Sequence, residues 1–344
     1  MGLLDCTARP GVDDLLCAVD IGTVSTRLMV ARTDPAGRVE RLEGEARITD
    51  LGEGVDATGL LCQQAVSRTL GTVGDYVARV KDHARRAGRP LPVAVTMTSA
   101  ARDAANAGDL TEGLEAMGLK PQVIAGTVEA SLSLLGVTAD FQGQNLMVAD
   151  VGGGSTELTC GGLMADGSLA VGACGSYDVG CRRLAERFSM AEQAADDGQV
   201  AAARSWVAEV LAPRFEHRAG LPNLLVCVGG TATSLVAVAN GLDPYDPAFV
   251  HLHPMGRKTV HELAERLPRL SLTQRAELPG LQPKRAAVIG AGAIVLDVLL
   301  ELGGWDGYTA SESDSLFGLV ACMDARQKGL RPPFGWAPQT AFIA

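Results

Sequence analysis

Aromatic side chains are scarce in this sequence, at 4% of 344 residues. Modules that bind single-stranded nucleic acid stack bases on aromatic rings, so this scarcity argues against that class. The formal net charge of −10 also argues against duplex DNA or an anionic membrane surface as a partner. A polyanionic substrate would need local cations or a metal ion at its binding site.

Several covalent and targeting signals are also missing. None of the eight cysteines belongs to a C-x-x-C pair, and Cys17 and Cys227 lie within apolar runs, which is typical of reduced, buried thiols. No cationic start precedes an apolar core as in a secretory signal, and no uncharged apolar run reaches the roughly 18 residues of a membrane helix. We therefore expect a cytoplasmic protein with no membrane partner.

The length and the hydrophobic pattern predict a two-domain α/β protein. A chain of 344 residues exceeds what one hydrophobic core usually organises. Apolar runs of strand length alternate with helical patterns, which favours mixed sheets covered by helices. Strands are expected at 15–21, 28–31, 93–97, 122–125, 146–151, 157–160, 168–172 and 224–228. Helices are expected at 60–87, 100–107, 128–136, 179–188, 191–211, 232–239, 256–267 and 284–302.

A segment of 13 residues recurs along the chain. Residues 16–28 and 146–158 align without a gap at a constant offset of 130, and Asp, Gly, Ser, Thr and Leu coincide. Each copy has the pattern of a buried strand, a tight turn with glycine and a second strand. Repeats this far apart indicate duplicated domains. A third apolar run ends in Gly229-Gly230-Thr231, where a helix could begin.

These turns have the residue types of a phosphate site. Glycine lets the backbone approach a phosphate, successive free N–H groups bind anions, and Ser and Thr hydroxyls add donors. The G-x-G-x-x-G dinucleotide pattern is absent. The predicted phosphate contacts are Gly22, Thr23, Ser25, Arg27, Gly152, Gly153, Gly154, Ser155, Thr156, Gly229, Gly230 and Thr231.

The aspartate that ends each first strand suggests a cation between the repeats. If the two hairpins face each other, Asp20 and Asp150 lie on opposite walls of one cleft and repel each other unless a cation lies between them. Carboxylate oxygens are ligands that Mg²⁺ prefers. We expect such a cleft to grip a polyphosphate.

Four further segments narrow the interpretation: 96–106, 124–130, 278–286 and Ser311-Glu312 with Gly318. They match the patterns ATSA-x-RDA-x-N, ISG-x-EEA, LPGL-x-P-x-RAD and SE…G. Together with the repeated hairpins, they resemble the exopolyphosphatase/guanosine pentaphosphate phosphatase (Ppx/GppA) family of the actin-like ATPase superfamily. The resemblance runs from about Leu16 to Val320.

The resemblance implies two duplicated actin-like (ribonuclease H-like) domains with mixed sheets, flanking helices and an interdomain cleft. We expect the first domain at 1–137, completed by a C-terminal helix at about 312–326, and the second at 138–311. The Pro-rich segment 327–344 is expected to be a flexible tail. Longer family members append a helical phosphohydrolase-like region, and we expect this chain to be a short, two-domain member without it.

The resemblance also implies roles for individual residues. Glu129 matches the family's catalytic base, which aims the attacking water, and Arg102 matches an arginine that contacts phosphate. Asp150 and Glu157 match the family's metal-site acids, and with Asp20 they form the predicted site for Mg²⁺ or Mn²⁺. In-line hydrolysis of a phosphoanhydride needs these elements: an aimed water, a carboxylate and cations on the developing charge.

Three positions depart from the family pattern. Val24 replaces an Asn after the first phosphate loop, Val128 replaces the first Glu of EEA, and Ala287 replaces the Asp of RAD. Three functions therefore stay open: an exopolyphosphatase, a guanosine pentaphosphate (pppGpp) phosphohydrolase and a non-catalytic regulator that binds polyphosphate or the alarmone. A sugar- or acetate-type kinase is disfavoured because no acceptor-binding segment accompanies Gly229-Gly230-Thr231. Whether the chain forms a homodimer also stays open.

Overall fold

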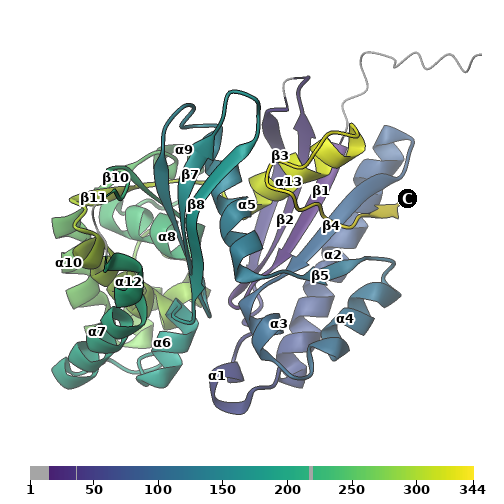
Figure 1. The fold of residues 1–344 in the computed structure, drawn as a ribbon. Helices are drawn as coiled ribbons and strands as arrows, with labels where there is room; N and C mark the ends of the chain where they lie inside the picture. Colours follow the sequence, from purple (N-terminus) through teal and green to yellow (C-terminus); the bar gives the residue numbers. More distant parts are fainter. Residues whose placement is uncertain (1–14, 36, 217–219) are drawn as a thin grey trace, which may run out of the picture.

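A computed structural model describes residues 15–35, 37–216 and 220–344. It contains two six-stranded sheets side by side, each mixed in strand direction and covered by helices (Figure 1). We call each sheet with its helices a lobe. This architecture confirms the predicted α/β fold with two sheets flanked by helices.

The first sheet has the order β12-β4-β1-β2-β3, and β5 also pairs with β4. Its strands are β1 (Leu15–Ile21), β2 (Ser25–Thr33), β3 (Val39–Ile48), β4 (Leu91–Met97), β5 (Pro121–Val123) and β12 (Ala341–Ile343). The helices of this lobe are α1 (Val55–Thr58), α2 (Gln63–Ala87), α3 (Ser99–Asp103), α4 (Ala107–Ala116), α5 (Gly126–Thr138) and α13 (Ser315–Gln327).

The second sheet has the order β10-β11-β9-β6-β7-β8. Its strands are β6 (Leu146–Val151), β7 (Thr156–Leu163), β8 (Leu169–Tyr177), β9 (Leu225–Val228), β10 (Pro254–Gly256) and β11 (Gly307–Ala310). Its helices are α6 (Cys181–Arg187), α7 (Asp197–Leu211), α8 (Gly229–Asn240), α9 (Pro247–Val250), α10 (Arg257–Arg266), α11 (Leu272–Ala276) and α12 (Ala286–Gly303). Single 3₁₀ turns cover Ala212–Phe215, Leu267–Arg269 and Pro283–Arg285.

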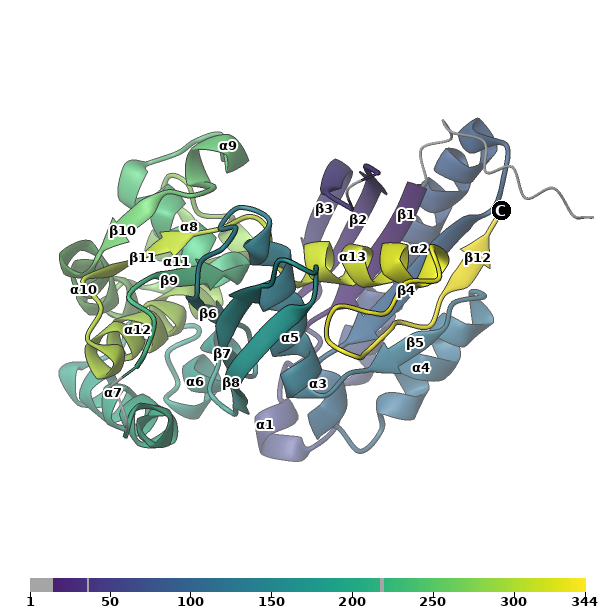
Figure 2. The same cartoon turned by 45° about the horizontal axis from the view of Figure 1, so that its top comes forward.

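Hydrophobic packing joins the two lobes through α5 and α13. These helices pack against each other, α13 also contacts β1 and β2, and α5 contacts β6, β7 and β8 (Figure 2). One cluster of buried side chains therefore spans both sheets, with Leu16, Leu134, Val148 and Leu319 among its members. Separate clusters cover the outer faces of the first and the second sheet. The shared core fixes the inner edges of the sheets beside each other.

The two repeated hairpins have the same geometry. β1 pairs antiparallel with β2 and parallel with β4, while β6 pairs antiparallel with β7 and parallel with β9. In each turn the first glycine donates to a serine carbonyl three residues later, Gly22 to Ser25 and Gly152 to Ser155, both at 3.0 Å. The predicted equivalence of the two hairpins is confirmed.

The C-terminal segment differs from the expected flexible tail. Residues 341–343 form β12, which pairs antiparallel with β4 through the partners Ala341↔Val93 and Ile343↔Leu91. β5 covers only the other half of this edge of β4, so β12 satisfies backbone groups that would otherwise stay unpaired. The alternating side chains bury Ala341 and Ile343 and expose Phe342. The proline content indicated flexibility and was misleading here.

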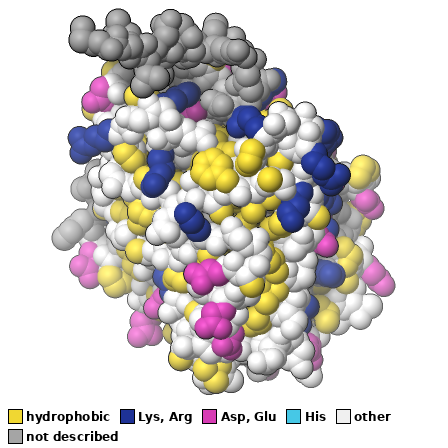
Figure 3. Space-filling model, turned by 90° about the vertical axis from the view of Figure 1, so that its right-hand side faces the viewer, with side chains coloured by type: hydrophobic (Ala, Val, Ile, Leu, Met, Phe, Trp, Pro, Cys, Tyr) yellow, Lys and Arg dark blue, Asp and Glu magenta, His cyan; other side chains and the backbone are white. Residues whose placement is uncertain are grey.

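The right-hand side of the molecule, shown in Figure 3, has a mixed surface in which hydrophobic side chains lie among Lys, Arg, Asp and Glu. α12 is the one described helix that is long and apolar enough to cross a membrane, and 78% of that segment is buried inside the protein. It packs against α6, α7, α8 and α10 as the central helix of the second lobe.

Candidate functional site

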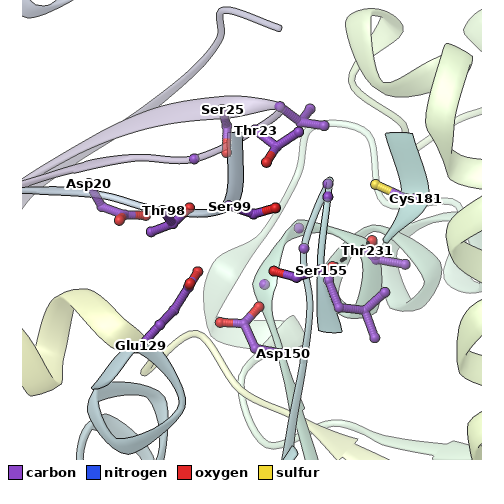
Figure 4. A pocket seen from close by; sticks show the side chains of 18 of the residues that line it. Asp20, Thr23, Ser25, Thr98, Ser99, Glu129, Asp150, Ser155, Cys181 and Thr231 are labelled. Atoms are coloured by element: carbon purple, nitrogen blue, oxygen red, sulfur yellow. Dashed lines mark hydrogen bonds between the residues drawn. The ribbon is translucent and has the colours of Figure 1, made fainter. Parts of the chain in front are cut away.

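A small cavity of about 70 Å³ lies where the tips of the two hairpins meet. Asp20 lines it from the first hairpin and Asp150 from the second, while Glu129 enters from the first turn of α5 (Figure 4). Ser155 and Ser25 extend into the same space. The structure thus brings together residues that are far apart in the sequence.

The Gly152–Gly154 loop lines the cavity, and two of its carbonyls are held by α6. The first N–H groups of α6 donate to these carbonyls, Cys181 to Gly152 at 2.9 Å and Arg182 to Gly153 at 2.8 Å. Gly180 allows this close approach, since a Cβ at that position would collide with the Gly153 backbone. Among the described residues, the N–H groups of Gly153 and Gly154 have no acceptor.

In the first loop, too, the carbonyls accept hydrogen bonds from a neighbouring segment. The carbonyl of Thr23 accepts from Gly52 N–H at 2.8 Å, and that of Val24 accepts from Asp50 N–H at 2.9 Å. Among the described residues, the N–H groups of Thr23 and Val24 have no acceptor either. Both loops line one cavity, and loops with free backbone N–H groups can bind anions such as phosphate.

The guanidinium of Arg27 lies between the carboxylates of Asp20 and Asp314. Its Nη2 donates to Asp20 Oδ2 at 2.7 Å and to Ser315 Oγ at 2.9 Å, and its Nη1 donates to Asp314. Burial opposes the charge of Arg27, but Asp314 and Asp20 outweigh it and raise the pKa of the guanidinium. Arg27 lines the cavity, yet its donors are already engaged by carboxylates.

The second hairpin carries two buried acids, and one of them, Glu157, lies 3.7 Å from the Arg102 guanidinium. Burial raises the pKa of Asp150 to about 6, with Arg27 opposing the shift and Asp314 adding to it. Burial and the charge of Asp150 raise the pKa of Glu157 to about 7. Ser133 Oγ donates to Asp150 at 2.9 Å, and Ser155 Oγ donates to Glu157 at 2.7 Å. This part of the site favours an added cation.

Glu129 has the surroundings of an active carboxylate. Arg102 Nη1 donates to Glu129 Oε2 at 2.7 Å and to the Ile124 carbonyl at 3.0 Å, which fixes both side chains. Burial and the charge of Glu157 raise the pKa of Glu129 well above its ordinary value, and Arg102 opposes this shift. Such a group can position a water and accept its proton.

Two carboxylates at the cavity, those of Asp20 and Asp150, fit Mg²⁺, but they do not form a complete ligand set. Within residues 15–35, 37–216 and 220–344, no three His, Cys, Asp or Glu side chains come close enough together to enclose a metal ion. Mg²⁺ commonly takes one or two carboxylates and keeps waters or substrate phosphates as its other ligands. Asp20 and Asp150 offer such oxygens at the cavity wall.

Most of the predicted contacts line the cavity, but three do not. Those that line it are Asp20, Gly22, Thr23, Ser25, Arg27, Glu129, Asp150, Gly152, Gly153, Gly154, Ser155, Gly229, Gly230 and Thr231. Arg102 and Glu157 lie one layer behind it, in contact with Glu129 and Ser155. Thr156, a predicted phosphate contact, does not line the cavity: its side chain is fully buried and its hydroxyl donates to the Val179 carbonyl.

Sequence reasoning missed other wall residues: Val24, Thr98, Ser99, Val151, Cys181 and Arg285. Ser99 and Arg285 lie in the motifs 96–106 and 278–286, so the motifs indicated their neighbourhood but not their role. Thr231 lines the cavity, although its hydroxyl donates to the Val151 carbonyl at 3.1 Å. Nothing in the sequence around Cys181 indicates a position at the site.

Comparisons with known proteins agree with this geometry. The chain is 35% identical over 323 residues to exopolyphosphatase 2 of Mycobacterium tuberculosis, covering 89% of this chain and 97% of that one. Its fold is similar to the crystal structure of an exopolyphosphatase-like protein, with a TM-score of 0.79, 30% identity and coverage of 90% and 97%. It is also similar to the Ppx/GppA family member of Aquifex aeolicus, with a TM-score of 0.73, 25% identity and coverage of 91% and 98%.

These likenesses establish the fold as two actin-like domains. Residues 17–302 match the model of the Ppx/GppA phosphatase family. The family match covers more than half of the chain, and the cavity between the hairpins is built from the same segment. The chain therefore belongs to the Ppx/GppA phosphatase family and is a hydrolase of that class.

Proposed function

We propose that this protein is a Mg²⁺-dependent exopolyphosphatase that releases the terminal phosphate of inorganic polyphosphate. The observation that carries the proposal is the pair of loops with free backbone N–H groups that line one cavity into which Glu129 points. The name of the mycobacterial relative, exopolyphosphatase 2, supports the choice of substrate. The unpaired thiols of the described cysteines support a reducing, cytoplasmic location.

The residues of the protein would have two tasks in the reaction: some bind the phosphate and others activate the attacking water. Backbone N–H groups of the two loops, with Ser25 and Ser155, hold the terminal phosphate. Glu129 aims the attacking water in line with the bond to the leaving phosphate and takes up its proton, while Arg102 keeps the carboxylate in place. Mg²⁺, held by Asp20 and Asp150, would neutralise charge on the phosphate oxygens.

A second substrate is favoured by a specific feature. A larger cavity of about 1020 Å³ adjoins the first one and shares Arg27, Gly229, Gly230 and Arg285 with it. Tyr245 and several Leu and Pro side chains line it, so it has room for a nucleoside. Conversion of pppGpp to ppGpp by the same chemistry is therefore the second candidate. The presence of Glu129 and Asp150 in the cavity disfavours a non-catalytic regulator.

The test measures orthophosphate release from polyphosphate and from pppGpp at equal concentration, with excess Mg²⁺ and with excess chelator. We expect release from polyphosphate that depends on Mg²⁺ and is lost in Glu129→Gln. Release from pppGpp alone would replace the first candidate by the second. No release from either substrate, together with tight binding of one of them, would favour the regulator.

A further inference from the structure

α6 of the second lobe lies beside α1 of the first lobe (Figures 1 and 2). This contact joins the lobes in addition to the packing of α5 and α13. Ion pairs cross it: Arg182 of α6 pairs with Asp50, and Arg183 pairs with Asp56 and Asp103. The recess between these groups has a volume of about 10 Å³, the lower limit for one water molecule. The charged groups therefore contact each other directly.

The guanidinium of Arg183 is bonded to three separate segments. Its Nε donates to the Gly154 carbonyl at 2.8 Å, its Nη2 donates to Asp103 Oδ2 at 2.5 Å, and its Nη1 donates to Asp56. Burial opposes the charge of Arg183, but Asp103 and Asp56 outweigh it and raise the pKa of the guanidinium. Because the donors of a guanidinium point in fixed directions, these bonds fix the Gly154 carbonyl relative to two acids of the first lobe.

The backbone of α6 holds the same loop, Gly152–Gly154, which we call the second loop. The N–H of Cys181 donates to the Gly152 carbonyl, and the N–H groups of Arg182 and Arg183 donate to the Gly153 carbonyl. With the Nε bond to Gly154, every carbonyl of the second loop accepts from α6. A displacement of α6 would therefore carry the second loop with it.

The second loop also lies directly against the first lobe. A Cβ at Gly153 would collide with Thr23 of the first loop, and a Cβ at Gly154 would collide with the Ser99 hydroxyl. Ser99 lines the cavity, and its hydroxyl donates to Asp103 Oδ2 at 3.3 Å. The contact that Arg183 makes with Asp103 is thus continuous with the cavity wall.

The acids of the first lobe are connected to the first loop as well. Asp50, which pairs with Arg182, donates through its N–H to the Val24 carbonyl at 2.9 Å. The N–H of Gly54 lies 3.3 Å from the carboxylate of Glu186 on α6 and donates to it. α6 is therefore bonded both to the second loop and to the segment that supports the first loop.

We propose that Arg183 is a positioning residue for phosphate hydrolysis, which sets the spacing between the two loops by holding the second loop against the first lobe. The proposal rests on the proposed function, because it takes both loops to bind one phosphate. Arg183 does not line the small cavity, so it acts through the Gly154 carbonyl. A displaced loop would hold the phosphate out of line with the water at Glu129, and a misplacement of about 1 Å can lower the rate about 100-fold.

The kinetic test compares Arg183→Gln with Arg204→Gln, a matched control. Arg204 on α7 pairs with Asp297 on α12, so the control removes an ion pair that lies within the second lobe. We expect Arg183→Gln to lower kcat on long-chain polyphosphate about tenfold or more, with a smaller change in KM. Arg204→Gln should leave kcat within twofold, although Tm falls in both variants.

The conservative variant distinguishes positioning from charge alone. Arg183→Lys keeps the positive charge and can pair with one acid, but it has no Nε–H for the Gly154 carbonyl. We expect it to restore Tm more fully than kcat. A kcat of Arg183→Gln within twofold of the wild type would overturn the proposal.

Hydrogen exchange separates this proposal from the proposed function. The N–H groups of Cys181, Arg182 and Arg183 are bonded to carbonyls of the second loop, so their exchange shows whether the loop stays in contact with α6. Without substrate, both Arg183→Gln and Asp103→Asn should speed this exchange about threefold or more, and Arg204→Gln should not. Such a result with a wild type that releases no phosphate would support the role of Arg183 in holding the loop and refute the hydrolase assignment. Unchanged exchange in Asp103→Asn would overturn the role of the first lobe.

Discussion

Arg27 and Glu157 occupy equivalent positions in the two hairpins, and each lies across the strands from an aspartate. Arg27 is opposite Asp20 in the pairing of β1 with β2, and Glu157 is opposite Asp150 in the pairing of β6 with β7. The first pair is neutral, while the second is doubly acidic. The duplicated fold therefore places a neutral pair beside the cavity in the first hairpin and two acids in the second, of which Asp150 lines the cavity and Glu157 lies behind it.

This asymmetry predicts that the metal-free protein becomes less stable as the pH rises. The folded-state pKa values of Asp150 and Glu157 lie near 6 and 7, above the ordinary values of 3.8 and 4.5. The folded protein thus binds more protons than the unfolded chain between about pH 4 and 7, and the free energy of unfolding falls across that range. The loss at Asp150 alone is on the order of 3 kcal/mol.

Thermal unfolding between pH 5 and 8 checks this prediction. In excess chelator, Tm should fall with rising pH, and Mg²⁺ should reduce the fall because it binds the ionised acids. Asp150→Asn should flatten the profile in chelator. A Tm that rises from pH 5 to pH 8 in chelator would contradict the charge distribution described above.

The second prediction concerns Glu129. Because its carboxylate is held by Arg102 and points into the cavity, Glu129→Gln should lower kcat by roughly two to four orders of magnitude. Folding and substrate binding should be preserved, which circular dichroism and calorimetry check. Glu192→Gln, on the exposed segment before α7, is a matched control with unchanged kcat. Near-normal turnover in Glu129→Gln would remove Glu129 from the mechanism.

The third prediction concerns the metal. Asp150→Asn should raise the Mg²⁺ concentration for half-maximal rate, because the amide keeps the shape of the side chain but loses the charge that binds the ion. A titration of orthophosphate release against free Mg²⁺ measures the shift. Activity of the wild type that survives excess chelator would refute a role for metal.

The sequence predicted the fold because its signals are local and repeated. β1 and β6 have the predicted bounds, and the constant offset of 130 residues indicated the hairpins that meet at the cavity. The signals were weaker for β3, an edge strand in which charged residues alternate with others, and for β12, whose formation depends on the free edge of β4. Whether such a segment forms a strand depends on its pairing with a distant strand, and the composition of the segment does not reveal that pairing.

The residues of the candidate site could be predicted where the residue type indicates the position. They could not be predicted where tertiary contacts determine which side chains line the cavity. Glycines and aspartates at strand ends line the cavity as expected. Thr156 has the same residue type as Thr23, but the pleat of β7 turns its hydroxyl to Val179. Arg285 follows a motif without a striking composition, and only the fold places it beside Gly230.

Two of the three departures from the family pattern, Val24 and Ala287, lie at the same apolar cluster. Val24 belongs to a small apolar cluster with Ile48, Cys181 and Val288, which joins the two lobes beside the cavity, and Ala287 packs against that cluster. In the family pattern the same positions carry Asn and Asp. We therefore propose that the two departures are coupled, with an apolar contact in place of a polar pair.

The last prediction tests whether these two positions are coupled. Val24→Asn alone should destabilise the protein by about 1–3 kcal/mol, because it buries an amide among apolar side chains, and Ala287→Asp alone should also destabilise it. In the double variant, the amide can donate to the carboxylate, so the cost should fall below the sum by roughly 0.5–3 kcal/mol. Urea unfolding of the four proteins measures this coupling. Val66→Asn, which belongs to the separate cluster on the outer face of the first sheet, should be additive with Ala287→Asp. If Val24→Asn is equally additive with Ala287→Asp, the two departures are independent and the apolar contact is not a joint replacement.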